Sequence, residues 1–443
     1  MPFSFHTSFA FFLAIPAPIM YPLAVAFVLG VLVFVHEFGH YAVAKLCKVR
    51  VEVFSLGFGK RLWGFRRGDT DYRLSLLPLG GYVKMSGENP MEDRTGDAGE
   101  FMSHPRWQRF LIAIAGPAMN IILAVVVLTG VYMVHHDYNA VLHAPVDAIW
   151  ITPGSSAAKA GLQKGDRIIA LQDIKNPDWK QLLEAEIIPN QPLNVTVQRG
   201  ETTLNVKLTA EAKGSEQIGD VGLEMPEVVG WLEPGGPAEK AGVKVNDVLI
   251  SLDGKEVHSI VDMLVQLQTT KDKPVQLTVL RDGKESTINI TPMLMSDKFR
   301  VGLRPNHVEK LGFQAALVQS AIDCRENSLL IFKLVGGMLQ KKVSIKQMSG
   351  PIGIMKISGE AASIGWAPLL YVMALISINL AIFNLFPIPI LDGGLMLMLL
   401  IESIMRRDIN QQIKERAYQA AFVALILFAA VVIFNDLAKS FHG

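Results

Sequence analysis

The chain has 443 residues, half of them hydrophobic, and a mean hydropathy of +0.31. A soluble enzyme of this length would normally have a negative mean hydropathy, so we expect membrane-spanning segments. The net charge of +1 gives no reason to expect a nucleic-acid partner, and the two cysteines, Cys47 and Cys324, exclude a disulfide scaffold.

The first twenty residues are not typical of a signal peptide. They contain no basic segment, and Pro16 and Pro18 interrupt their apolar run. Met1 and Met20 both remain open as start sites.

Four segments are long and apolar enough to cross a bilayer, whose hydrocarbon core of about 30 Å needs about 20 helical residues. They occupy 21–46, 111–134, a stretch within 361–391, and 417–435. The connection between the first two, counted from Lys45 to Arg109, carries twelve Lys or Arg, and the connection between the last two carries four. Because short basic loops stay in the cytoplasm, we predict that both connections are cytoplasmic and that the termini and the long insert are extracytoplasmic.

The end of the first segment carries the sequence His36-Glu37-Phe38-Gly39-His40. Positions i and i+4 of a helix lie on one face, with Cβ atoms about 5–6 Å apart, so both histidines can reach one zinc ion. Glu37 lies beside this face, where it can accept a proton from a water molecule that the metal makes more acidic. Two surface histidines are the simpler alternative, but a Glu in a charge-free apolar run is a candidate functional residue.

The basic connection contains two strand-like runs, RVEVFSLGFGK and DYRLSLLPLGGYVKM, separated by RRGDTD. This pattern predicts a β-hairpin. Two roles are open for it: an amphipathic hairpin that only lies on the membrane surface, or one that also contacts a substrate.

The insert, about 141–305, contains a repeat. The sequence PGSSAAKAGLQKGDRIIALQD at 153–173 aligns without gaps on PGGPAEKAGVKVNDVLISLDG at 234–254, and nine of the twenty-one positions are identical. Alternating, strand-like sequences with Arg-Gly or Asp-Gly turns follow each copy. The insert therefore resembles a PDZ domain in duplicate.

A PDZ domain binds an extended peptide by strand addition. The resemblance places the peptide grooves at four positions: Gly161, Leu162, Gly242 and Val243. The alternative is a pair of domains that act as spacers or steric filters without tight peptide binding. After the insert, residues 311–360 are predicted to form amphipathic helices at the membrane surface.

A catalytic zinc needs a third protein ligand and an open position. Residues 41–50 contain no Asp, Glu or His, whereas Asp392 borders the third segment in the sequence NLFPIPILDGG. Pro387 and Pro389 cannot continue a helix, and non-helical backbone at this depth must be satisfied by protein or water. A proline kink with Asp392 reaching the membrane surface is the simpler alternative.

Three motifs together resemble the site-2 protease family of intramembrane zinc metalloproteases. They are HEFGH at the end of the first segment, GPAMN at 116–120 in the second, and NLFPIPILDGG after the third. The duplicated PDZ-like insert is similar to that of the bacterial members that cleave an anti-sigma factor. The resemblance covers residues 20–440.

The resemblance implies roles for individual residues. His36, His40 and Asp392 match the ligands of one Zn2+ ion per chain, and Glu37 matches the catalytic base. The positions implied for substrate binding are Asn379, Asn384, Pro387 and Pro389 near the third segment, and Gly57, Phe58 and Gly59 at a hairpin edge. The resemblance also implies location in the bacterial inner membrane, with the active site toward the cytoplasm.

The predicted fold is a multi-span α-helical membrane protein with four transmembrane helices, an inserted pair of α+β PDZ domains and a membrane-associated β-hairpin region. The predicted divisions are 1–46, 47–106, 107–136, 141–214, 218–305, 311–360, 361–392, 393–416 and 417–437. The expected partners are the lipid bilayer, single-span substrates of the anti-sigma factor type, remnant signal peptides and a PDZ-bound peptide.

The predicted activity is hydrolysis of peptide bonds in transmembrane segments. Two other classes of protein are consistent with part of the sequence. A membrane-anchored PDZ scaffold without catalysis would leave the His, Glu and Asp motifs unexplained. A metal transporter would need polar residues along several spans, and the cores of the second and fourth segments contain no carboxylate or histidine.

Overall fold

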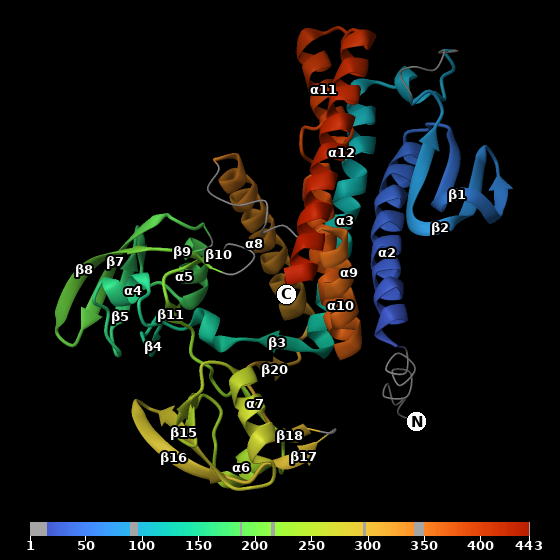
Figure 1. The fold of residues 1–443 in the computed structure, drawn as a ribbon. Coiled ribbons are helices and arrows are strands. Elements are labelled where there is room, and N and C mark those ends of the chain that lie inside the picture. The colour runs from blue at the N-terminus through green and yellow to red at the C-terminus, as the bar shows by residue number, and fades with distance from the viewer. Residues whose placement is uncertain are drawn as a thin grey trace. The chain divides into compact units, whose positions relative to one another are not determined.

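The computed structural model describes residues 16–88, 96–186, 188–213, 218–295, 298–340 and 350–442. The predictions that concern the start site and residues 341–349 therefore lie outside the described residues. The chain separates into two compact units (Figure 1). We call them the helical unit, which comprises Met1–Met133, Leu311–Val335 and Met348–Gly443, and the strand-rich unit, which comprises Val134–Lys310 and Gly336–Gln347.

Each of the four predicted apolar segments is a helix in the described part of the helical unit. These helices are α2 (Ala17–Leu46), α3 (Arg106–Val134), α10 (Trp366–Asn384) and α12 (Gln411–His442). Each contains an apolar stretch of at least 19 residues, which is long enough to cross a membrane. The prediction of four membrane-crossing candidates is confirmed.

Three further helices accompany them: α8 (Phe313–Leu339), α9 (Pro351–Ile364) and α11 (Asp392–Met405). The last of these was not anticipated, since residues 393–416 were expected to be a connection. Gly365 separates α9 from α10, so the long apolar stretch that precedes Asn384 is two helices and not one.

Helix α2 is packed along its whole length by other helices of the helical unit. Near its start, Met20 and Ala24 pack against Ala362 of α9. In its middle, Val28 and Leu32 pack against Met373 of α10. These contacts fix the helix that carries the HEFGH motif.

The last turns of α2 contact the base of a two-stranded antiparallel hairpin, formed by β1 (Val51–Arg67) and β2 (Thr70–Met85). Phe54 of β1 packs edge-on against Phe34 of α2, and the hydroxyl groups of Tyr41 and Tyr72 lie 2.5 Å apart. The predicted hairpin is present, and its base is held on α2 by aromatic side chains.

The strand-rich unit contains the same arrangement twice, as the sequence repeat suggested. The two four-stranded sheets have the orders β6-β5-β7-β8 and β14-β13-β15-β16. The strands of the first are β5 (Arg167–Leu171), β6 (Ile174–Lys175), β7 (Pro192–Arg199) and β8 (Thr202–Thr209). The strands of the second are β13 (Val248–Leu252), β14 (Lys255–Glu256), β15 (Val275–Arg281) and β16 (Lys284–Ile290).

Each sheet is accompanied by two helices and one short strand pair. The helices are α4 (Ser156–Lys159) and α5 (Trp179–Glu186) in the first copy, and α6 (Pro237–Ala241) and α7 (Ile260–Thr270) in the second. The pairs are β4 (Trp150–Ile151) with β11 (Leu223–Glu224), and β12 (Trp231–Leu232) with β19 (Leu303–Arg304).

Three more strand pairs and two short 3₁₀ helices complete the described elements. The pairs are β3 (His136–Tyr138) with β20 (His307–Glu309), β9 (Glu211–Lys213) with β10 (Ile218–Asp220), and β17 (Met293–Met295) with β18 (Lys298–Arg300). The 3₁₀ helices are η1 (Phe101–Ser103) and η2 (Ala140–His143).

The two copies have separate hydrophobic cores. The first extends from Val141 to Leu223, and the second from Val229 to Val301. Since β11 pairs with β4, the segment around Leu223 packs with the first copy. The boundary between the two cores therefore lies in the sequence between Leu223 and Val229.

Candidate metal centre

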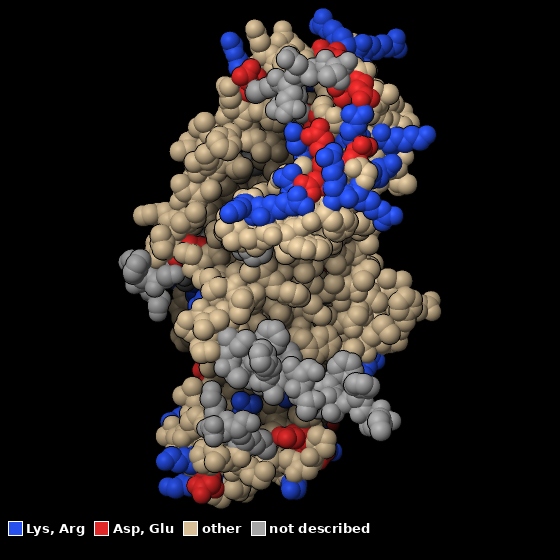
Figure 2. Space-filling view, turned by 90° about the vertical axis from the view of Figure 1, so that its right-hand side faces the viewer, with Lys and Arg blue, Asp and Glu red and all other residues tan. Residues whose placement is uncertain are grey.

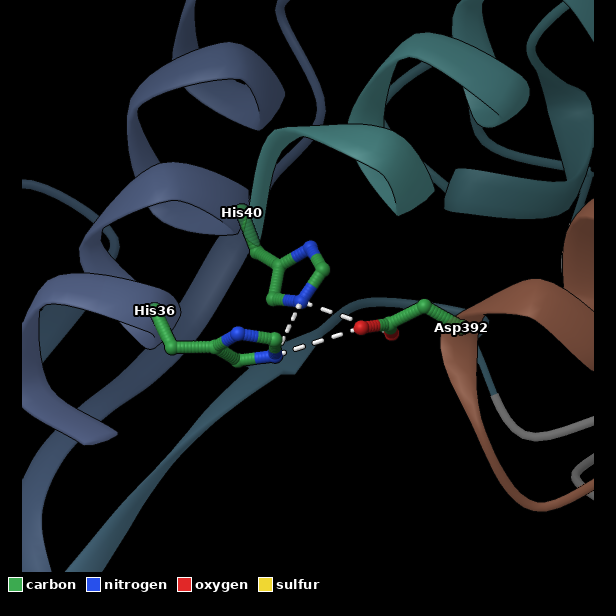
Figure 3. Close-up of side chains that lie close together, drawn as sticks. All are labelled: His36, His40 and Asp392. Carbon is green, nitrogen blue, oxygen red and sulfur yellow. Dashed lines mark hydrogen bonds and ion pairs between the residues drawn. The ribbon is translucent and has the colours of Figure 1, made fainter. Parts of the chain in front are cut away.

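Three side chains from opposite ends of the sequence meet in the helical unit. The Nε2 atom of His36 lies 3.2 Å from Oδ2 of Asp392, and the Nε2 atom of His40 lies 3.4 Å from Oδ1 of the same carboxylate. The two Nε2 atoms are 3.2 Å apart. Figure 3 shows both imidazoles of α2 directed toward the carboxylate at the start of α11. The three potential ligand atoms, one from each of these residues, all lie within 4.8 Å of one another.

One face of α3 lies against the two histidines. The carbonyl oxygen of Ile112 lies 2.7 Å from Nδ1 of His40, and Nδ2 of Asn120 lies 3.3 Å from Nδ1 of His36. Gly116 lies midway between them, and any side chain there would overlap the imidazole of His40. Residues four apart share a helix face, so the spacing along α3 matches the spacing of the histidines along α2.

The loop after α10 places Asp392. Helix α10 ends at Asn384, and a non-helical segment that contains Pro387 and Pro389 follows. Gly393 and Gly394 then lie directly on main-chain carbonyl groups of this loop, where a Cβ atom would overlap the backbone. The prolines stop the helix and the glycines allow the next one to start against the loop, which brings its first residue to the histidines.

Asn384 itself points into the centre. Its Nδ2 atom lies 3.3 Å from Nε2 of His36. A side-chain N–H at this position is suitably placed to donate a hydrogen bond to a group bound beside the histidines.

Glu37 is held from the other side by the hairpin. The main-chain N–H of Val83 in β2 donates a hydrogen bond to Oε2 of Glu37, with N and O 3.0 Å apart. Glu37 lines a cavity of about 310 Å³ together with the three clustered side chains. The other residues that line it include Tyr82, Val83, Glu88, Ile112, Asn384 and Leu395. The carboxylate is therefore next to a space large enough for a peptide segment and water.

The donor set fits a zinc ion. Two imidazole nitrogens and one carboxylate oxygen are ligands that catalytic zinc sites use, with a fourth position left for water or substrate. The N–H at Nδ1 of His40 has an acceptor in the carbonyl of Ile112, which leaves Nε2 as the unprotonated nitrogen that faces the cluster. The residues present can thus hold the metal in a defined orientation.

Other predicted site residues lie outside this cavity. Asn379 is an exposed residue of α10, and Pro387 and Pro389 shape the loop. Gly57, Phe58 and Gly59 lie in β1, where the ring of Phe58 stacks on Tyr82 at a centroid distance of 6.2 Å. Of this group, Phe58 reaches the cavity only through Tyr82, one of the residues that line it.

The four residues predicted at peptide grooves are structural elements of the two repeats. Leu162 and Val243 are 7% and 3% exposed and belong to the two cores. Gly161 and Gly242 have φ angles of +80° and +93°. Their carbonyl groups accept hydrogen bonds from Arg199 and Arg281, respectively.

Sequence reasoning missed three contacts at the centre, those of Val83 with Glu37, of Ile112 with His40 and of Asn120 with His36. A main-chain contact such as that of Val83 leaves no signal in the amino-acid sequence. Asn120 did leave a signal in the sequence, because it is a polar residue inside an apolar helix. It lies eight residues, or about two helical turns, after Ile112.

The fold and the site define a membrane-embedded metallopeptidase. Residues 24–428 match the model of peptidase family M50, and the chain belongs to this family. A putative zinc metalloprotease of Vibrio cholerae is 33% identical over 93% of this chain and 97% of its own length. Proteins named regulator of sigma-E protease RseP, from Salmonella typhimurium and Escherichia coli, are 31% and 30% identical over the same shares.

Membership of this family fixes the class of reaction. The chain is an intramembrane zinc protease, a multi-pass inner-membrane protein whose cofactor is Zn2+. The predictions of family, enzyme class and cofactor are confirmed.

Proposed function

We propose that this protease cuts single-span membrane proteins within or beside the bilayer, with His36, His40 and Asp392 as the zinc ligands and Glu37 as the general base. The convergence of the three ligand atoms within 4.8 Å, next to a carboxylate in the same cavity, carries the proposal. A zinc ion held there supplies Lewis acidity, which polarises a peptide carbonyl and makes water a better nucleophile.

The residues of the chain have separate tasks in this reaction. Glu37 accepts the proton of the attacking water and delivers it to the leaving amine, while the N–H of Val83 holds its other carboxylate oxygen in place. The side-chain N–H of Asn384 donates to the carbonyl oxygen of the peptide, where negative charge develops.

The substrate must be unwound before cleavage, because a peptide bond inside a helix is not accessible to a base and a metal. The hairpin supports an extended substrate by strand addition at an outer edge. Residues 53–56 pair on both sides, with 71–74 and with 81–84, so 81–84 is an edge that can accept a further strand. We place this contact near Gly57, Phe58 and Gly59, close to the Phe58–Tyr82 stack beside the cavity. Asn379, Pro387 and Pro389 belong to the same proposed substrate path.

The substrate class follows from the relatives and the insert. The relatives from Salmonella typhimurium and Escherichia coli are named for regulation of sigma-E. We therefore assign two substrates to this chain: a single-span anti-sigma factor that another protease has first trimmed, and remnant signal peptides. The two repeats of the strand-rich unit are PDZ domains in this account. They act as an outer filter, with peptide binding as the second role that the duplicated PDZ pattern allows.

Charge distribution supports an orientation. Figure 2 shows many Lys and Arg side chains, with Asp and Glu among them, gathered over the part of the helical unit that carries β1 and β2, next to a broad band of uncharged surface. Basic residues in short loops favour the cytoplasmic side. The hairpin and the metal centre therefore face the cytoplasm, and the termini and PDZ domains are extracytoplasmic.

Reconstitution tests this function. The full-length chain, loaded with zinc in proteoliposomes, would receive a single-span reporter without an extracytoplasmic domain or the same reporter with a folded domain. We expect cleavage of the first reporter, loss of cleavage with a zinc chelator, recovery with added zinc, and resistance of the second reporter. Failure of the zinc-loaded chain to cut any trimmed reporter would favour a PDZ scaffold without catalysis.

A further inference from the structure

We propose that Asn120 is a positioning residue for the metal centre: its carboxamide oxygen accepts the Nδ1–H of His36 and so holds Nε2 of this imidazole toward the zinc. The inference rests on the proposed role of His36 as a ligand. It concerns a residue of α3 that is not among the residues that line the cavity.

The position of Asn120 is fixed by its surroundings. The residue is completely buried, and its side-chain amide lies 3.3 Å from Nδ1 of His36. Its main-chain carbonyl accepts a hydrogen bond of 2.8 Å from the hydroxyl of Ser377 in α10. This bond ties the main chain of α3 to α10 at the residue whose carboxamide faces His36.

The chemistry of a ligating imidazole decides which amide atom faces it. When Nε2 uses its lone pair for a metal, Nδ1 carries the proton and needs an acceptor. A half-turn of the carboxamide exchanges its oxygen and nitrogen, and only the oxygen can accept. The zinc-loaded state therefore has Oδ1 of Asn120 toward His36.

The carboxamide is not fully satisfied where it lies. The amide atom that points away from His36 has no hydrogen-bond partner among the described residues and is buried. Turning the amide changes which of its two atoms is unpaired, but one buried polar atom still lacks a hydrogen bond. An unpaired buried polar atom costs roughly 1–3 kcal/mol, so a leucine of similar size would be more favourable for folding. Asn120 contributes to the site at a cost to stability, which indicates a functional role.

The two histidines are oriented by different means. Nδ1 of His40 faces a main-chain carbonyl, that of Ile112, which substitution cannot remove. Nδ1 of His36 faces the side chain of Asn120, which a substitution can remove. Loss of an outer partner of a metal-binding histidine typically weakens metal affinity by roughly 10–100-fold.

The test compares zinc affinity with the stability of the metal-free protein. The full-length chain in nanodiscs would be titrated against a chromophoric zinc chelator, and thermal unfolding would be recorded without metal. We expect Asn120→Leu to weaken zinc binding by roughly 10–100-fold while leaving unfolding of the metal-free protein unchanged or at higher temperature. Asn120→Asp, which restores an acceptor, should recover most of the affinity.

Two control variants make the outcome specific. Thr129→Val removes another buried polar group of α3, one that bonds to Ser320 at 2.9 Å, and should leave zinc affinity unchanged. His36→Ala should abolish tight zinc binding. If His36→Ala binds zinc normally, the proposed metal centre fails. If it does not bind but Asn120→Leu retains affinity within about threefold of the parent, or Asn120→Asp gives no recovery, only the inference on Asn120 is overturned.

Discussion

The main-chain N–H of Val83 and the Oε2 atom of Glu37 lie 3.0 Å apart, which joins strand β2 to the carboxylate beside the metal centre. Glu37 follows His36 in α2, so its orientation depends on both the helix and the hairpin. Because the donor is a main-chain N–H, the link survives any change of the side chain at position 83 except one to proline, which has no N–H. The hydrogen bond between Val83 and Glu37 should instead be sensitive to displacement of strand β2.

Gly81 provides a way to displace this strand. A Cβ atom at this residue would lie 2.6 Å from the carbonyl oxygen of Ser55 and 3.6 Å from Cγ of Glu37. We expect Gly81→Val to reduce turnover of a trimmed reporter by roughly 10–100-fold, because small misplacements of a catalytic group are costly, while zinc content stays unchanged. Leu76→Ala, at an exposed position of the same strand, is the matched control. Normal turnover of Gly81→Val would show that Glu37 does not depend on the hairpin.

Asp392 completes the ligand set and can be tested by metal binding alone. Asp392→Asn keeps the size of the side chain but removes the negative charge next to both histidines. We expect a loss of zinc affinity at least as large as the roughly 10–100-fold typical of an outer partner. Competition with a chelator measures it, and Asp408→Asn, which breaks an exposed ion pair with Arg106, is the control. Unchanged affinity would remove Asp392 from the site.

The duplicated insert supplies its own control for a stability prediction. Arg199 donates to both carboxylate oxygens of Asp166 at 2.7 Å, and Arg281 makes the same pair with Asp247 at 2.6 Å. We expect Arg199→Gln to accelerate amide exchange in β5 and β7 by a factor of about ten or more, since hydrogen bonds to charged groups are among the stronger ones. Arg281→Gln should act on β13 and β15 instead. Exchange that changes equally in both repeats would contradict this.

The same pair predicts a pH dependence. The side-chain hydrogen bond from Arg199 lowers the pKa of Asp166 below its ordinary value. A lowered carboxyl pKa in the folded state contributes stability that is present above the unfolded pKa of about 3.9 and is lost as the pH falls through the folded pKa. The difference in exchange between the parent and Arg199→Gln should therefore shrink in acid. A difference that grows with acidification would contradict the sign of this effect.

Asp436 near the end of α12 caps the start of α9. Its carboxylate accepts hydrogen bonds from the main-chain N–H groups of Gly350, Ile352 and Gly353 at 2.9–3.1 Å. Loss of such a cap costs roughly 0.5–2 kcal/mol, so Asp436→Ala should lower the unfolding temperature of the chain in detergent. It should also loosen the packing of α9 on α2, measured by cross-linking of cysteines at positions 24 and 362. Ser363→Ala, at the exposed end of α9, is the control.

The sequence was most informative where chemistry demands particular residues at fixed spacing. His36, Glu37 and His40 define a metal-binding helix face, and the absence of a nearby third ligand directed attention to Asp392. The structure brings His36, His40 and Asp392 together and places Glu37 in the same cavity. The apolar segments were equally clear, because the thickness of the bilayer sets a minimum length of apolar helix.

The sequence was least informative where tertiary packing decides. Helix α11 was missed because the apolar residues after Asp392 follow two prolines and were read as part of a connection. Leu162 and Val243 were predicted at peptide grooves from a short repeated motif, which does not reveal that their side chains also belong to the two cores. The contact between Val83 and Glu37 depends on how the hairpin docks on α2, and aromatic side chains scattered over both elements determine that docking.

The most direct test of the central claim is a comparison of the parent chain with Glu37→Gln in one reconstituted system. Cleavage of a trimmed single-span reporter and bound zinc would be measured on the same samples. The account predicts one zinc ion in both proteins and a loss of cleavage on the order of 10²–10⁴-fold or more in Glu37→Gln, because the base that moves the proton is gone while the ligands remain. Equal cleavage by both proteins, with equal zinc, would contradict the role of Glu37.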